Sequence, residues 1–132
     1  MKPLTFLVVD DEKAIRGILS RTVRMKGHVA LEAATADEAI GIYEQQPVDA
    51  VFTDINTKSP KNGLDLVRAV HLANKAPIYV FATPHDGQET EVEAHIASGV
   101  IARYVAKPYT SAQVQECIDA VVAQYQARDQ SK

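Results

Sequence analysis

Short apolar runs alternate with amphipathic segments five times along the 132-residue chain. The runs are nearly continuous and rich in β-branched and aromatic residues, which is typical of strands buried on both faces. They predict strands over residues 4–9, 29–33, 50–53, 78–82 and 102–106. The intervening segments show helical spacing and predict helices over residues 13–26, 36–45, 63–72, 88–98 and 111–126.

Start and stop signals support these boundaries. Thr35 with Glu38, and Thr110 with Gln113, have the spacing of a capping box at a helix start. Gly27 ends the first predicted helix. The apolar face of that helix is predicted at Ile15, Ile18, Leu19, Thr22 and Val23, and that of the last helix at Val114, Cys117, Ile118, Val121 and Tyr125. The basic residues of the first helix are expected mostly on a solvated face that could also meet a partner helix: Lys13, Arg16, Arg21, Arg24 and Lys26.

Strands that alternate with helices predict an α/β fold with right-handed crossovers and helices on both faces of a parallel sheet. Five units predict the smaller doubly wound form, (βα)5 and flavodoxin-like, with strand order 2-1-3-4-5. We expect one domain over residues 1–126, a short polar tail over 127–132, and no output domain.

Composition narrows the possible functions. The 14 Lys and Arg residues against 17 Asp and Glu give a net charge of −3, which does not indicate direct nucleic-acid binding. The single cysteine, Cys117, excludes an intrachain disulfide. No stretch has the roughly 18 apolar residues of a membrane span, and no signal peptide is visible. We therefore expect a cytoplasmic protein without a membrane partner.

Polar residues stand where the predicted strands end. Asp10 and Asp11 follow the first strand, Asp54 the third, Thr83 the fourth and Lys107 the fifth. Ligands of doubly wound sheets bind at the carboxyl ends of the strands, near the point where strand order reverses. The sequence therefore predicts a small acidic cleft with a hydroxyl and a lysine at its rim.

Three carboxylates in one cleft repel each other, by about 4 kcal/mol for a pair 4 Å apart at an effective dielectric constant near 20. A hard cation relieves this repulsion, and Mg²⁺ takes carboxylate and phosphate oxygens together. A carboxylate can itself accept a phosphoryl group. Separately, each residue has an ordinary explanation: Asp10 and Asp11 as helix caps, Asp54 as a turn residue, Lys107 as a surface lysine. Their occurrence together at four strand ends favours a phosphoryl-transfer site.

Four stretches resemble the receiver domain of two-component response regulators. They are residues 7–12 (LVVDDE), residues 51–56 (VFTDIN), residues 83–86 (TPHD) and residues 104–108 (YVAKP). Each is weak alone, whereas their order and spacing over about the first 110 residues are specific.

The resemblance implies a metal site and an acceptor. Asp10 and Asp11 would hold Mg²⁺ or Mn²⁺, and Asp54 would be both phospho-acceptor and metal ligand. The backbone carbonyl of Asn56 would be the remaining protein ligand. The donor would be a phosphohistidine on a histidine kinase or a histidine phosphotransfer protein.

The resemblance also implies a switch. Lys107 would pair with the phosphoryl oxygens, while Thr83 and Tyr104 would move toward the phosphoryl group. The face of the fourth helix, fifth strand and fifth helix would then bind an unknown downstream protein or form homodimers. Such a protein is a signalling domain and not an enzyme, since it catalyses only its own phosphotransfer and dephosphorylation.

Some residues depart from the family pattern. Gly63 lies nine residues after Asp54, so this loop is about one residue longer than the commonest form. Pro84 lacks the N–H that helps to bind the phosphoryl group in the family, a loss of roughly 1.5–3 kcal/mol. His85, near the mouth of the site, is a candidate modulator of hydrolysis.

The sequence also raises two alternative functions. Pro84 supports the alternative that the chain is a non-phosphorylated, receiver-like interaction module. A phosphatase-like hydrolase is disfavoured, because Asn56 stands where a second acid would be needed.

Overall fold

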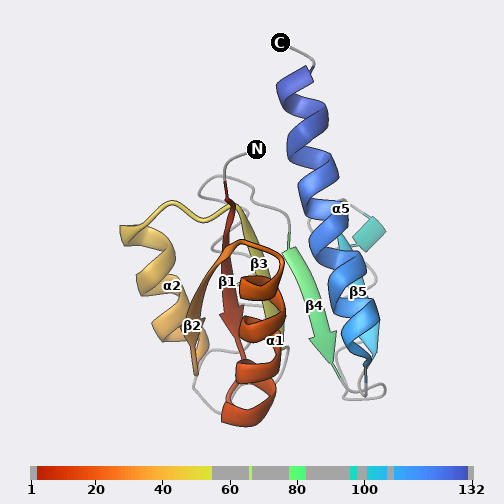
Figure 1. Ribbon diagram of the computed structural model, residues 1–132. Helices are drawn as coiled ribbons and strands as arrows, with labels where there is room; N and C mark the ends of the chain where they lie inside the picture. Colours follow the sequence, from red (N-terminus) through yellow and green to blue (C-terminus); the bar gives the residue numbers. More distant parts are fainter. Residues whose placement is uncertain are drawn as a thin grey trace.

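The computed structural model describes residues 3–54, 66, 78–82, 96–97, 101–106 and 109–130. The described elements are β1 (Thr5–Val9), α1 (Lys13–Met25), β2 (Val29–Ala33), α2 (Ala36–Gln45), β3 (Ala50–Asp54), β4 (Ile78–Ala82), β5 (Arg103–Ala106) and α5 (Ser111–Gln130). The strands form one parallel sheet in the order β2-β1-β3-β4-β5, which confirms the predicted doubly wound fold (Figure 1).

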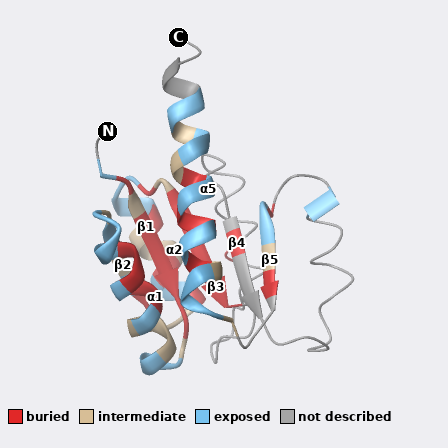
Figure 2. Cartoon of the chain, turned by 45° about the vertical axis from the view of Figure 1, so that its right-hand side comes forward, coloured by how far each residue is buried: buried red, intermediate tan, exposed pale blue. Residues whose placement is uncertain are grey.

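Helices on both faces bury the central strands completely. Phe6 and Val8 of β1 pack with residues of α1 and α5, while Leu7 and Val9 pack with residues of α2. All four side chains are 0% exposed. Figure 2 shows the same concentration of buried residues in β1 and β3. Burial from both sides explains why these strands are continuous apolar runs and do not alternate.

The predicted helix boundaries have the expected capping contacts. Glu38 N donates to Thr35 Oγ1 at 3.1 Å at the start of α2. At α5 the capping box is reciprocal: Gln113 N donates to Thr110 Oγ1 at 3.2 Å, and Thr110 N donates to Gln113 Oε1 at 2.8 Å. Gly27 follows α1 with a φ of +87°, a conformation that costs glycine little and other residues more.

Two predicted details are wrong. Ile18, which was predicted on the inner face of α1, is 47% exposed, whereas Ser20 is buried. The buried face of α1 therefore includes Leu19, Ser20 and Val23. Residues 127–130 continue α5 and do not form a tail. Nothing in the sequence after residue 126 stops a helix, because neither glycine nor proline follows.

The two remaining predicted helices lie mostly outside the described residues. Leu66 is helical and buried, and residues 96–97 are helical. No helix among the residues that the structure describes combines the length and apolar character needed to cross a bilayer.

The amino end of the sheet is joined to the last helix by hydrogen bonds. Thr5 N donates to Asp49 Oδ2 at 2.8 Å, and Asp49 N donates to Thr5 O at 2.8 Å. The Tyr125 hydroxyl of α5 donates to Asp49 O at 2.6 Å. These bonds fix α5 against the start of β1 and β3.

Candidate functional site

Strand register brings the predicted acids together. β1 and β3 pair in parallel with Val9 beside Thr53, so Asp10 and Asp54 follow at the same sheet edge. Asp10 is 0% exposed and Asp54 is 7% exposed, whereas Asp11 is half-buried. One carboxylate oxygen from each of the three lies within 4.8 Å of the others. The predicted acidic cluster is therefore present at the carboxyl end of the sheet.

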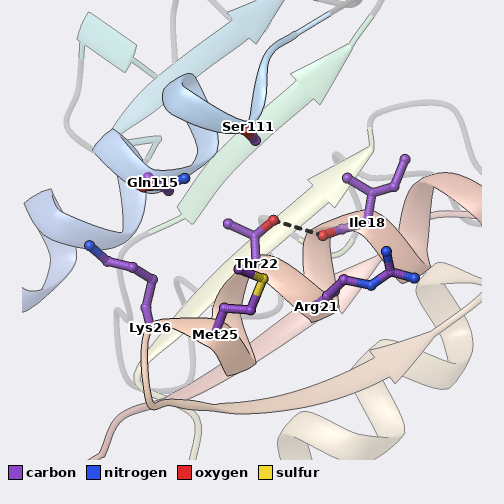
Figure 3. A pocket seen from close by; sticks show the side chains of 7 residues that line it. All are labelled: Ile18, Arg21, Thr22, Met25, Lys26, Ser111 and Gln115. Carbon is purple, nitrogen blue, oxygen red and sulfur yellow. Dashed lines mark hydrogen bonds between the residues drawn. The ribbon is translucent and has the colours of Figure 1, made fainter.

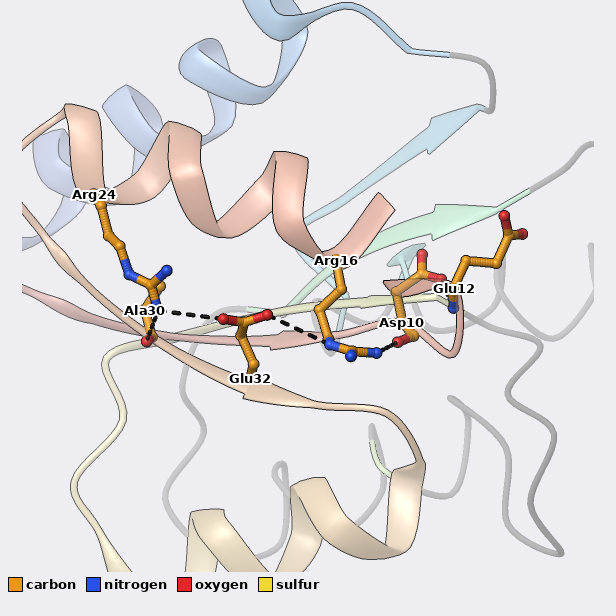
Figure 4. Close-up of polar contacts among 6 residues, drawn as sticks. All are labelled: Asp10, Glu12, Arg16, Arg24, Ala30 and Glu32. Atoms are coloured by element: carbon orange, nitrogen blue, oxygen red, sulfur yellow. Dashed lines mark hydrogen bonds and ion pairs between the residues drawn. The ribbon is translucent and has the colours of Figure 1, made fainter. Parts of the chain in front are cut away.

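The backbone and side chain of Asp10 are held from three directions. Asp10 N donates to Ala33 O of β2 at 3.2 Å. Its Oδ1 accepts from Glu12 N at 2.9 Å, and its carbonyl accepts from Arg16 Nη1 at 2.8 Å (Figure 4). The N-cap of α1 is Glu12, which makes no side-chain capping bond. Helix capping therefore does not account for the two aspartates, since neither occupies the cap position.

Asp54 is the last residue of β3. The sequence had predicted that the strand ends at Thr53, with Asp54 just beyond it. It pairs in register with Phe81 of β4. Its carbonyl accepts from the buried Thr53 hydroxyl at 2.9 Å. A carboxylate at the end of a fully buried central strand has a fixed backbone, which is the condition for placing a nucleophile accurately.

Tyr109 is a neighbour of the acids that sequence reasoning missed. Its hydroxyl oxygen is shielded from solvent, and its ring packs on the α1 and α5 side of the core. Burial, and then the negative charges of Asp10, Asp54 and Glu12, raise the pKa of the Tyr109 phenol well above 10. The hydroxyl therefore stays protonated beside the acidic cluster. The sequence could have indicated this position, because Tyr109 lies two residues after Lys107, which was predicted at the same edge of the sheet.

The rim residues are only partly within the described chain. Tyr104 of β5 is half-buried, pairs in register with Val80 and packs against the α2-side core. Ala82 pairs with Ala106, the residues directly before Thr83 and Lys107. The predictions for Asn56, Thr83, Pro84, His85 and Lys107 lie outside the described residues.

The donor set suits a hard divalent cation. All three donors are carboxylate oxygens, the ligands that Mg²⁺ and Ca²⁺ prefer. Two oxygens bound to one Mg²⁺ at about 2.1 Å each are at most about 4.2 Å apart. A spread of no more than 4.8 Å is therefore close to direct ligation, and small side-chain rotations or a bridging water close the difference.

A groove lies between α1 and α5 on the same side of the sheet. Figure 3 shows the side chains that line it: Ile18, Arg21, Thr22, Met25, Lys26, Ser111 and Gln115. Ile18 and Met25 are large apolar residues that are 47% and 78% exposed. Arg21 and Lys26 are exposed beside them. Met and Arg are enriched in protein-contact surfaces, whereas Lys is depleted there.

Known response regulators resemble this chain in sequence, and solved receiver domains resemble it in fold. The chain is 26% identical to the transcriptional regulatory protein YvrH of Bacillus subtilis over an alignment of 133 positions, covering 99% of this chain and 54% of that protein. The receiver domain protein from Clostridium thermocellum superposes with a TM-score of 0.81 at 20% identity, covering 94% of this chain and 98% of that one. The chemotaxis response regulator CheY4 of Vibrio cholerae superposes with a TM-score of 0.77 at 23% identity, covering 91% and 99%.

The curated relatives are longer than this chain, and the sequence similarity covers only one region of each. The chain spans between 23% and 54% of the length of the curated relatives that it matches. The family model for the response regulator receiver domain matches residues 6–119, which contain the acidic cluster and all the described strands except Thr5, the first residue of β1. The chain therefore belongs to the receiver domain family of two-component response regulators.

Proposed function

We propose that this receiver domain takes a phosphoryl group onto Asp54 in a reaction that requires Mg²⁺ or Mn²⁺. The observation that carries the proposal is the placement of carboxylate oxygens from Asp10, Asp11 and Asp54 within 4.8 Å of one another. Asp54 is the candidate nucleophile because its backbone is fixed at the end of the central strand β3. Asp10 and Asp11, from the turn after β1, are the candidate metal holders, and the Asn56 carbonyl is a further candidate ligand.

The chemistry requires little covalent assistance. A carboxylate oxygen of Asp54 forms the new bond to phosphorus while the bond from phosphorus to the donor's imidazole nitrogen breaks. The electron pair of that bond stays on the imidazole nitrogen, which takes up a proton. A bound divalent ion supplies charge neutralisation for the phosphoryl oxygens. Lys107, one residue beyond β5, is proposed to neutralise a further oxygen.

The phosphodonor is proposed to be a phosphohistidine on a histidine kinase or phosphotransfer protein, and α1 is proposed to meet it. α1 begins two residues after Asp11, and α5 begins two residues after Tyr109, so both helices start beside the acids. The groove between them presents Ile18 and Met25 with the cation Arg21, and with Lys26, whose Nζ lies 3.1 Å from Asp119 Oδ1 of α5 (Figure 3). A donor helix with apolar and acidic residues fits this surface and is held next to Asp54.

The output is proposed to be a population shift at a protein-interaction face. Thr83 and Tyr104 are the candidate switch residues, and their contact with the phosphoryl group favours one of two arrangements of that face. Tyr104 packs half-buried on the α2-side core, so its movement would be coupled to repacking there. Pro84 and His85 are proposed to set the lifetime of the phosphorylated state. The downstream protein, or a second copy of the chain, would read the face formed by β5 and α5 with the helix before β5.

Labelling with acetyl phosphate tests the acceptor directly. The protein is incubated with acetyl phosphate and Mg²⁺, and its intact mass is measured. We expect one added phosphoryl group on the wild-type protein and none on Asp54→Asn. Asp49→Asn is the matched control, because Asp49 is a carboxylate at the opposite end of the same sheet, and it should be labelled normally.

Two results would refute the proposal. Labelling of Asp54→Asn at the wild-type rate would move the acceptor to another residue. Absence of labelling in the wild-type protein, while a control receiver is labelled, would favour the non-phosphorylated interaction module that Pro84 suggests.

A further inference from the structure

We infer that Arg16 is a positioning residue for the acidic site, an inference that rests on the metal-binding part of the proposed function. The Arg16 guanidinium bridges two elements: Nη1 donates to Asp10 O at 2.8 Å, and Nε lies 3.4 Å from Glu32 Oε1 of β2 (Figure 4). The Arg16 side chain is only 17% exposed. It therefore has a defined place, although the sequence indicated a solvated face for the basic residues of α1.

The carbonyl that Arg16 holds belongs to the peptide group between Asp10 and Asp11. The orientation of that peptide sets the ψ of Asp10 and the φ of Asp11, and hence the relative directions of their side chains. Asp10 is also fixed through its N–H to Ala33 O and through Oδ1 by Glu12 N. The Arg16 contact is thus the side-chain bond that fixes the second half of the Asp10 backbone, where the chain turns toward Asp11.

Glu32 holds the guanidinium from the other side. Its two oxygens face two arginines of α1, with Oε1 near Arg16 and Oε2 accepting from Arg24 Nη2 at 3.3 Å. Arg24 also donates to Ala30 O of β2 at 3.1 Å, and its side chain is 55% exposed. Arg16 and Arg24 thus share helix, charge and carboxylate partner, and of these two arginines Arg16 is the one that donates to Asp10 O. Arg24 is therefore a matched control.

When Arg16 is removed, a positioning role and a purely electrostatic role predict opposite changes in Mg²⁺ affinity. A guanidinium near a cation site repels the cation, so charge alone predicts tighter Mg²⁺ binding when Arg16 is removed. Residues that orient metal ligands do the reverse, since their loss typically weakens metal affinity by about 10- to 100-fold. The direction of the change therefore separates the two roles.

The test is the Mg²⁺ dissociation constant, measured by calorimetric titration of the wild-type chain and of Arg16→Met, Arg16→Lys and Arg24→Met. We expect Arg16→Met to bind Mg²⁺ about tenfold more weakly. Arg16→Lys should weaken binding in the same direction, because a single ammonium nitrogen cannot hold both Asp10 O and Glu32. Arg24→Met should stay within about twofold of wild type, as expected of an exposed ion pair.

Urea unfolding of the same variants without Mg²⁺ separates positioning from a general structural role. Arg16→Met that loses stability but keeps its Mg²⁺ affinity would overturn the inference. Tighter binding by Arg16→Met with unchanged binding by Arg16→Lys would also overturn it. If Arg16→Met does not fold, Arg16→Lys supplies the same comparison.

The experiments distinguish failure of the proposed function from failure of the Arg16 inference. A wild-type chain that binds Mg²⁺ but is not labelled by acetyl phosphate would refute the acceptor role of Asp54, and the Arg16 inference would still be decided by the affinities. A wild-type chain that binds no Mg²⁺ would refute both.

Discussion

The two ends of the sheet use aspartate in opposite ways. At the amino end, the Asp49 carboxylate accepts from Thr5 N at 2.8 Å, and its backbone bonds to Thr5 and to the Tyr125 hydroxyl. At the carboxyl end, three aspartates gather with oxygens within 4.8 Å, and two of them are buried. The first arrangement stabilises the fold through hydrogen bonds. The second brings like charges together, at a cost in stability that a bound cation would offset.

The comparison shows that strand-end polarity is not by itself a sign of function. Asp49 directly precedes β3 and is half-buried, whereas Asp54 ends β3 and is buried. The Asp49 carboxylate accepts from a backbone N–H, whereas a carboxylate oxygen of Asp54 lies within 4.8 Å of oxygens from two other carboxylates. Loss of charge should therefore change stability in opposite directions at the two ends, and only variants at the carboxyl end should lose the stabilisation by Mg²⁺.

The largest expected stability effect is a gain from Asp54→Asn without metal. Two carboxylates 4.8 Å apart repel by about 3.5 kcal/mol at an effective dielectric constant near 20, and closer pairs repel more. Neutralising Asp54 should thus raise the free energy of unfolding by about 3–4 kcal/mol. Urea unfolding in a chelator measures this change. A loss of stability would show that repulsion does not dominate this cluster.

Asp49→Ala should have the opposite sign. It removes the acceptor for Thr5 N, and loss of a hydrogen bond to a charged group costs about 1.5–3 kcal/mol. The free energy of unfolding should fall by that amount both with and without Mg²⁺. Asp49→Asn retains a side-chain oxygen and should lose less. An equal loss in Asp49→Asn would point to charge, and not to this hydrogen bond, as the stabilising feature.

Tyr125→Phe should have a smaller effect at the same end. It removes the donor to Asp49 O while keeping the ring against the α1 and α5 side of the core. The expected loss is about 1 kcal/mol, read from the urea midpoint. Acetyl phosphate labelling should be unchanged, because Tyr125 lies at the end of the sheet opposite the acids. Impaired labelling would mean that the two ends are coupled.

The smallest expected effect is the acid sensitivity of His28. Leu4 N donates to His28 Nδ1 at 3.0 Å, and burial, followed by the charge of Lys26, lowers the pKa of His28 below 6.5. The unfolded chain therefore binds this proton more readily than the folded chain. Stability should begin to fall as pH drops through about 6.5, and the contribution is lost below the folded pKa. His28→Asn should flatten this part of the stability profile, and an unchanged slope would assign it to other groups.

The sequence predicted the strands well because burial on both faces leaves a continuous apolar signal. The bounds of β2 and β4 agree with the prediction residue for residue. The centre of a helical face was harder to predict, as Ile18 shows, because periodicity alone does not decide which flank of an apolar stripe meets the sheet. The end of α5 was also missed, since frayed and helical polar segments have similar compositions.

The site was predicted where it depends on strand ends and missed where it depends on long side chains. Asp10, Asp11 and Asp54 follow from parallel pairing, which carries strand ends to one edge. The contact of Arg16 with Asp10 O depends on a rotamer and on Glu32 of another strand. Tyr109 approaches the acids through the path of the chain after β5. The Arg16 contact leaves no spacing pattern in the sequence, and the signal for Tyr109 is only its position two residues after Lys107.

The most direct test of the central claim is the stability gained from Mg²⁺ at the two ends of the sheet. The free energy of unfolding is measured in chelator and in saturating Mg²⁺ for the wild-type chain, Asp49→Ala and Asp54→Asn. At Mg²⁺ concentrations near 100 times the dissociation constant, the wild-type chain and Asp49→Ala should both gain about 2.7 kcal/mol. Asp54→Asn should gain far less, since it lacks one carboxylate of the site. Equal gains in all three proteins, or no gain in the wild-type chain, would contradict a cation site formed by these acids.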